Sequence, residues 1–304
     1  MQTVLISLPI FLIIFSGWFF RKVAIVDKTW VTTLNGFAYY IALPSLIVSS
    51  FLSVDFFDSN TWTLAFESIT IVILFSLFVF LVLLPFKMDR GIKNAVLLGS
   101  MVGNTVFLGF PLIEINFGVG YLSQSALIGS FLLIVPILLA MVFIQHQNVS
   151  QAFSFKREFF EFIKNPLVLS VVVGVLLSLL HPDYVLFESI TKTLSMLGST
   201  ASPIALFALG AFLCGKSKNN IGILLLVSFF KLLVFPLGAI LVSLYVFKQG
   251  DVKVLTLLSS MPVAVTTFVI AEKCGLDEKL IGDSILVSTI LSFFVVPIIV
   301  FFFV

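Results

Sequence analysis

Apolar side chains fill runs of about 20 residues from one end of the chain to the other, and short polar segments separate the runs. A helix of that length crosses the roughly 30 Å hydrocarbon core of a bilayer. Helices are the expected form because lipid supplies no hydrogen-bond partners for the backbone. The pattern predicts an all-α polytopic membrane protein with ten transmembrane helices. The predicted spans cover residues 3–20, 30–52, 62–86, 94–117, 121–144, 166–180, 186–213, 221–247, 252–271 and 280–304.

The fourth predicted span contains residues that interrupt a helix at mid-depth. Gly103, Asn104 and Thr105 form a poor helical stretch, and Pro111 follows them. Proline removes a backbone donor and clashes with the preceding turn. We therefore expect two half-helices joined by an extended stretch at about 104–108.

The ninth span has a similar interruption, because Pro262 predicts a break near Ser259. Half-helix N-termini present free N–H groups and partial positive charge, which suit a carboxylate. Broken helices at equivalent places in two halves are typical of the binding site of a secondary transporter. The alternative is that these Gly and Pro residues only permit kinks and close helix packing.

Weak internal matches indicate a repeat. Corresponding positions recur at offsets of 157 to 161 residues: Pro9 and Pro166, Gly17 and Gly174, Pro44 and Pro203, Gly118 and Gly275, Pro136 and Pro297. With five spans in each half, the halves would have inverted topology. The predicted organisation is a first five-helix repeat at 1–144, a cytoplasmic connecting loop at 145–165 and a second, inverted repeat at 166–304.

Positive charge alternates between successive connections. One alternating set contains Arg21, Lys22, Lys28, Lys87, Arg90, Lys93, Lys156, Arg157, Lys164, Lys216, Lys218, Lys273 and Lys279, and the other contains only Lys192, Lys248 and Lys253. Cytoplasmic connections are the ones enriched in Lys and Arg. The chain is therefore expected in the cell membrane, with both termini outside.

Two charged residues lie inside predicted spans. Lys231 is about eleven residues into the eighth span, close to mid-depth, and Glu67 is the only carboxylate within the third. A buried Lys costs at least about 2.5–3.5 kcal/mol unless it is paired. We expect an internal ion pair between them, with Glu67 as a candidate proton site. The alternative is a purely structural pair.

Several motifs resemble those of the auxin efflux carrier family, in the same order along the chain. They are segments 35–46, 103–111, 117–118, 165–166, 202–210 and 261–264, together with Lys231 and Pro236. The resemblance implies a bacterial member with ten helices in two inverted five-helix repeats and two crossed, broken helices, similar to the bile acid/sodium symporter fold. Spans one, two, six and seven would form a scaffold and the others a moving transport domain, as in an elevator mechanism. Plant members export the indole carboxylate auxin, and bacterial members are linked to malate, malonate and similar acids.

The resemblance and the predicted breaks together give the expected substrate-binding residues. Asn104 matches the family's substrate-contacting Asn, and Tyr39 would line the scaffold side, although Tyr is also common as an interface anchor. The full set is Gly103, Asn104, Thr105, Pro111, Met261, Pro262, Val263, Ala264, Thr266, Pro44, Tyr39 and Pro203. Lys231 would supply the positive charge that sodium supplies in sodium-coupled relatives.

Composition excludes several classes of protein. Charged residues make up 11% of the chain and hydrophobic ones 60%, too little charge for a water-facing surface. The net charge of +2 does not favour nucleic acid. Neither cysteine has a metal-ligand neighbour, so no metal or cofactor is expected. No catalytic constellation of an intramembrane enzyme is present.

The expected partners are a small organic anion and the lipid bilayer, with a homodimer as a candidate assembly. The alternatives to a transporter are an anion channel or a membrane receptor or scaffold.

Overall fold

The computed structural model describes residues 2–52, 54, 56–147, 164, 166–180, 185–214, 220–248, 252–274 and 276–303. Over these residues the chain is all-helical, which confirms the predicted class, and no strand forms beyond one isolated bridge. Among the described residues, six helices are long and apolar enough to span a membrane: Lys28–Phe51, Asn60–Leu83, Val119–Ala140, Phe187–Phe212, Ile221–Phe247 and Glu278–Phe302. The chain is therefore a multi-pass membrane protein.

The described residues up to Gln147 form seven α-helices and three short helical turns. They are α1 (Gln2–Lys22), α2 (Lys28–Phe37), η1 (Ala38–Ala42), α3 (Leu43–Phe51), α4 (Ser59–Leu83), α5 (Arg90–Met101), η2 (Thr105–Gly109), α6 (Phe110–Phe117), η3 (Val119–Tyr121) and α7 (Leu122–Gln147). Segments α2, η1 and α3 run on as one long helix.

The second part also contains long and interrupted helices. Its elements are α9 (Pro166–Leu180), α10 (Val185–Ser199), α11 (Ala201–Phe212), α12 (Ile221–Phe229), η4 (Phe230–Val234), α13 (Phe235–Val242), η5 (Ser243–Phe247), α14 (Lys253–Ser259), α15 (Thr266–Cys274) and α16 (Glu278–Phe303). Segments α12 to η5 again form one continuous helix.

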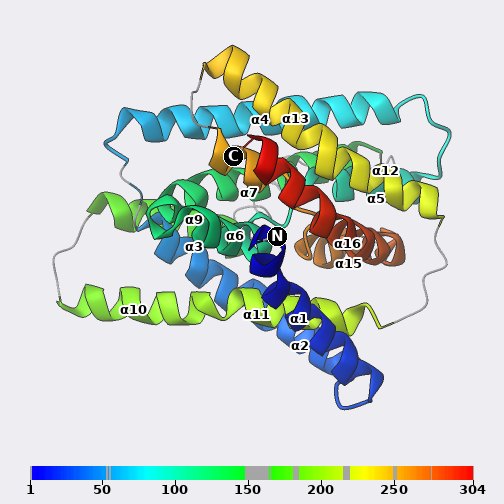
Figure 1. Ribbon diagram of the computed structural model, residues 1–304, viewed down its shortest axis with the longest axis horizontal. Helices are drawn as coiled ribbons and strands as arrows, with labels where there is room; N and C mark the ends of the chain where they lie inside the picture. The colour runs from blue at the N-terminus through cyan, green and yellow to red at the C-terminus, as the bar shows by residue number, and fades with distance from the viewer. Residues whose placement is uncertain are drawn as a thin grey trace.

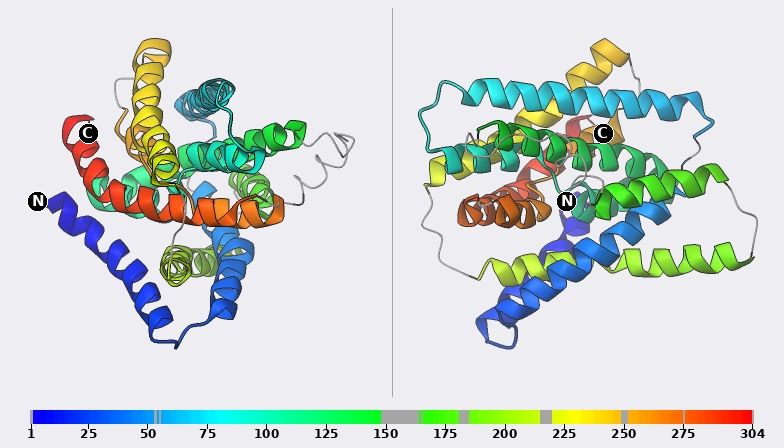
Figure 2. Two further views of the ribbon diagram at one scale, coloured as in Figure 1. Left: turned by 90° about the vertical axis from the view of Figure 1, so that its right-hand side faces the viewer. Right: turned by 180° about the vertical axis from the view of Figure 1, so that it is seen from behind.

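The helices sort into two packed groups (Figures 1 and 2). We call α1, α2–α3, α9 and α10–α11 the scaffold layer, because α1 packs along α11 and α3 packs on both α9 and α10. We call the remaining long helices, α4, α5–α6, α7, α12–α13, α14–α15 and α16, the core bundle. Contacts between the two groups are sparser than those within each group.

Glycines permit the tightest contact within the scaffold layer. A Cβ at Gly17 of α1 would collide with the Phe207 carbonyl, and one at Gly210 of α11 would collide with the Ile14 carbonyl. Reciprocal glycines let the two backbones touch, which is how membrane helices gain packing energy without a hydrophobic driving force. The backbones of α1 and α11 are therefore in close contact.

Three prolines each follow a π-helical turn. Pro44, Pro111 and Pro236 are the second residues of α3, α6 and α13, and the turns η1, η2 and η4 precede them. Proline has no N–H and crowds the turn before it, and the wider turn relieves both problems. The π-turns contain Tyr39, Thr105 and Lys231, three of the expected site residues.

Candidate functional site

Two interrupted helices cross at the centre of the molecule. Helix α5 ends at Met101, and the chain resumes helical form at Thr105; α14 ends at Ser259, and α15 begins at Thr266. The extended stretches between them pair through an antiparallel bridge from Gly103 to Val263. We call this pairing the crossover.

The crossover satisfies its own backbone groups. The Asn104 N–H donates to the Pro262 carbonyl at 2.8 Å, and the Ala264 N–H donates to the Val102 carbonyl at 3.1 Å. The Val263 N–H donates to the Ser288 hydroxyl of α16 at 3.1 Å. Irregular backbone is tolerated at membrane depth only when protein groups replace the missing helical hydrogen bonds.

One break lies where the sequence predicts it and the other does not. The break near Ser259 is confirmed. The extended stretch of the first helix covers 102–104 rather than 104–108. The reason is local, because turn η2 accommodates Pro111 and lets the helix resume at Thr105.

Two polar groups in the crossover have no hydrogen-bond partner among the described residues. They are the Asn104 amide nitrogen Nδ2 and the Thr266 hydroxyl, and both side chains are buried, at 2% and 6% exposure. Each lies at the start of a helical segment, where free N–H groups and partial positive charge collect. By contrast, the Thr105 hydroxyl donates to the Gly129 carbonyl of α7 at 3.2 Å, so its role in the structure is to fix η2 against α7.

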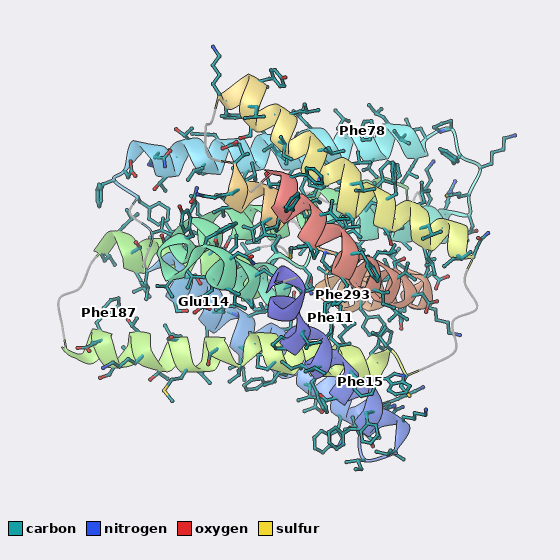
Figure 3. The ribbon with its side chains drawn as sticks, in the orientation of Figure 1. Phe11, Phe15, Phe78, Glu114, Phe187 and Phe293 are labelled. Atoms are coloured by element: carbon teal, nitrogen blue, oxygen red, sulfur yellow. The ribbon has the colours of Figure 1, made fainter. Side chains whose placement is uncertain are left out.

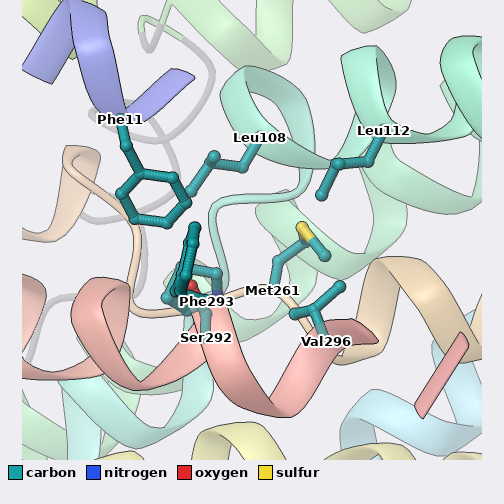
Figure 4. Close-up of a pocket in the computed structure, with 8 residues that line it drawn as sticks. Phe11, Leu108, Leu112, Met261, Ser292, Phe293 and Val296 are labelled. Carbon is teal, nitrogen blue, oxygen red and sulfur yellow. The ribbon is translucent and has the colours of Figure 1, made fainter. Parts of the chain in front are cut away.

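Two clefts between the scaffold layer and the core bundle reach the crossover. The first, which we call the Met261 cleft, is shown in Figure 4; it is lined by Phe11, Leu108, Leu112, Met261, Pro262, Ser292, Phe293 and Val296. The second, the Thr266 cleft, is lined by Asn35, Ala38, Tyr39, Leu43, Ala205, Val265 and Thr266. They share the stretch from α14 to α15 but no residue.

Most expected site residues gather at these places. Gly103, Asn104, Val263 and Ala264 build the crossover, Met261 and Pro262 line the first cleft, and Tyr39 and Thr266 line the second. The three helical prolines Pro44, Pro111 and Pro203 line neither cleft. Pro44 and Pro111 instead shape π-turns, and Pro203 is exposed on α11.

The clefts also contain residues that sequence reasoning did not select. Phe11, Phe293 and Ser292 line the Met261 cleft, and Figure 3 shows Phe11 and Phe293 close together. The chain has 36 Phe residues, and no local signal distinguishes these two from lipid-facing ones.

Lys231 lies directly behind the crossover. Its side chain is fully buried, and its Nζ lies 3.4 Å from the Ser259 carbonyl and 3.9 Å from the centre of the Phe235 ring. Ser259 ends α14, so Nζ faces the partially negative end of a helix and the face of an aromatic ring, both of which favour a cation. Lys231 therefore contacts both broken helices, since Gly103 also lies against its chain end.

The expected ion pair between Lys231 and Glu67 does not form. Among the described residues the salt bridge within 4.0 Å joins Lys192 to Glu188, on the surface of α10. Glu67 is buried at 2% exposure beside Ser243, and neither its Oε1 nor the Ser243 hydroxyl finds a hydrogen-bond partner in the part of the chain that the structure describes. Ser243 follows Lys231 by twelve residues, or about 18 Å of helix, so Glu67 faces a different level of the same span.

Comparison with known proteins supports a membrane role. The chain matches the model of a family described as membrane transport protein over residues 4–300. It is also similar to an uncharacterized transporter of Methanocaldococcus jannaschii, with 28% identity over 305 residues. That alignment covers 97% of this chain and 96% of the relative, so the likeness extends over the whole fold.

Proposed function

The chain belongs to the membrane transport protein family, the auxin efflux carrier-like family that its motifs resemble, and from this premise we propose that it moves a small organic anion by alternating access. The substrate class is a mono- or dicarboxylate such as malate, malonate or an auxin-like acid. The observation that carries the proposal is the crossover, where two buried donors, Asn104 and Thr266, have no partner among the described residues. Thr266 lines one cleft, and Pro262, which accepts the backbone hydrogen bond of Asn104, lines the other.

The donors suit an anion. Asn104 Nδ2 can only donate a hydrogen bond, and the Thr266 hydroxyl donates readily to a carboxylate. Leaving a buried donor unpaired costs about 1–3 kcal/mol, so a ligand that accepts from both recovers that cost. The substrate carboxylate would lie between Asn104 and Thr266, at the starts of the two half-helices.

Lys231 supports the same charge preference. It has no carboxylate within 4.0 Å among the described residues, and a buried cation without a counter-charge is expensive. A bound anion at the crossover supplies the missing negative charge. Lys231 would then take the place of a coupling metal ion.

The clefts support alternating access. Each is lined by residues from both groups, with Phe11 as the scaffold residue of the Met261 cleft. Displacement of one group against the other would open one cleft and close the other. In this proposal the core bundle is the moving transport domain of an elevator. The same proposal includes ten spans, the inverted repeats at 1–144 and 166–304 and the cytoplasmic loop at 145–165. It also includes a cell membrane location with both termini outside, and a homodimer. Most of the loop lies outside the described residues.

Counterflow in proteoliposomes tests transport. Vesicles preloaded with one unlabelled carboxylate should accumulate the labelled form against its gradient, because only a carrier exchanges the two. A panel of mono- and dicarboxylates, selected by thermal shift of the purified protein, identifies the substrate. Passive equilibration without counterflow would indicate an anion channel instead.

Asn104→Ala tests the site. Substrate affinity should fall roughly tenfold, the value of one good hydrogen bond to a charged group. Asn116→Ala is the matched control, because Asn116 donates within α6 to the Leu112 carbonyl and itself lines neither cleft. Equal affinity in the two variants would remove Asn104 from the site.

A further inference from the structure

Two aromatic contacts join the scaffold layer to the core bundle. The rings of Phe11 on α1 and Phe293 on α16 meet edge to face, with centroids 4.9 Å apart and planes at 89°. The rings of Phe212 on α11 and Phe268 on α15 meet at 4.1 Å and 50°. Each contact therefore pairs one ring from the scaffold layer with one ring from the core bundle.

Each aromatic pair joins helices that line a different cleft. Phe11 and Phe293 both line the Met261 cleft, and in Figure 4 their rings lie next to each other, to the left of Met261. Phe268 lies on α15 with Thr266, and Phe212 lies on α11 with Ala205, so the second pair joins two helices that line the Thr266 cleft. Phe212 also packs over Gly282 of α16, where a Cβ would collide with its ring.

We propose that these pairs are two gates, Phe11–Phe293 for the Met261 cleft and Phe212–Phe268 for the Thr266 cleft. The proposal rests on the transport function above and adds the residues that control access. An aromatic pair fits the role because its rings fill a large volume, while their mutual attraction is modest enough to be broken in each cycle. The gates also limit the width of a ligand that reaches the crossover.

A third aromatic pair provides an internal control. Phe20 on α1 and Phe207 on α11 are 6.2 Å apart, but both belong to the scaffold layer. This pair shares α1 with the first gate and α11 with the second. It bridges no interface that moves in the proposed cycle, so its removal should open neither cleft.

Cysteine accessibility tests the gates without substrate. In full-length protein with Cys214 and Cys274 replaced by Ser, a reporter Cys is placed at Leu108 for the first cleft or at Ala205 for the second. The rate of reaction with a methanethiosulfonate reagent is then measured. Phe293→Ala should raise the rate at position 108 about two- to tenfold, the value of one aromatic pair, and leave position 205 unchanged. Phe268→Ala should do the reverse, and Phe20→Ala should change neither.

The proposal is overturned if a gate variant speeds labelling at both reporter positions or at neither. It is also overturned if Phe20→Ala acts like the gate variants. Phe293→Leu and Phe268→Leu retain more bulk and should give smaller increases, which guards against an Ala variant that fails to fold.

Cross-linking tests the motion directly. A bifunctional thiol reagent should stop counterflow in the variant with Phe11→Cys and Phe293→Cys but not in the one with Phe20→Cys and Phe207→Cys. Full counterflow after cross-linking the first pair contradicts the gate, whereas no counterflow in the wild type contradicts the proposed function and leaves the labelling pattern standing.

Discussion

Gly103 and Lys231 lie in direct contact behind the crossover. A Cβ built at Gly103 would be 2.6 Å from both Cε and Nζ of Lys231. The extended stretch of the first broken helix can thus approach the eighth predicted span only because residue 103 has no side chain. This contact places the end of the Lys231 side chain against the backbone that forms the candidate anion site.

Gly103→Ala should therefore damage the site more than an ordinary glycine substitution does. The added methyl displaces the Lys231 chain end, which is fully buried and has little free space, so we expect a loss of about 1–3 kcal/mol in stability and weaker substrate binding. Gly36→Ala is the control, because nothing lies within 4 Å of a Cβ there. Thermal unfolding in detergent measures both, and equal midpoints would show that Lys231 moves aside without cost.

Lys231→Met should separate stability from binding. The side chain keeps much of its length but loses its charge, so removal of a buried cation without a carboxylate partner should leave the unfolding midpoint unchanged or raise it. Affinity for a carboxylate should fall at least about tenfold, because opposite charges even 8 Å apart attract by roughly 2 kcal/mol at an effective dielectric of 20. Ligand-dependent thermal shifts report both quantities. Wild-type affinity would mean that Lys231 serves only to cap α14.

Glu67→Gln tests the candidate proton site. Gln has the same size and cannot ionise, and the Glu67 Oε1 has no hydrogen-bond partner among the described residues to lose. We expect wild-type stability, together with uptake that no longer responds to an imposed pH gradient. Ser243→Ala removes the neighbouring hydroxyl and keeps the carboxyl, so it should retain the response. Gradient-driven uptake that persists in Glu67→Gln would exclude this carboxyl as the coupling group.

Transport should not require sodium. A sodium site needs several oxygen ligands, and the space behind the crossover holds the Lys231 chain end instead. Replacing sodium by potassium or choline at fixed pH and membrane potential should leave uptake by proteoliposomes unchanged. A strict sodium requirement would overturn the role assigned to Lys231.

Several features of this protein can be predicted from its sequence because they depend on local chemistry. The hydropathy runs determine an all-helical membrane protein, because lipid permits few other backbone forms. Pro262 and the stretch at Gly103 determine interruptions in two helices, since proline and glycine act on the turn they occupy. The motifs around Asn104 and Pro262 also identify the family, which the match over residues 4–300 confirms.

Tertiary structure decided which of these residues meet. The pairing of Gly103 with Val263 joins segments 160 residues apart, and the contact of Phe11 with Phe293 joins nearly the two ends of the chain. The expected pair of Glu67 and Lys231 was wrong because the depth of each residue within its span does not set how the two spans slide and rotate against each other. In a chain so rich in Phe, Leu and Val, packing of shapes rather than local pattern selects the partner of each buried side chain. The sequence therefore locates the breaks, and only the packed helices determine which side chains line the route past them.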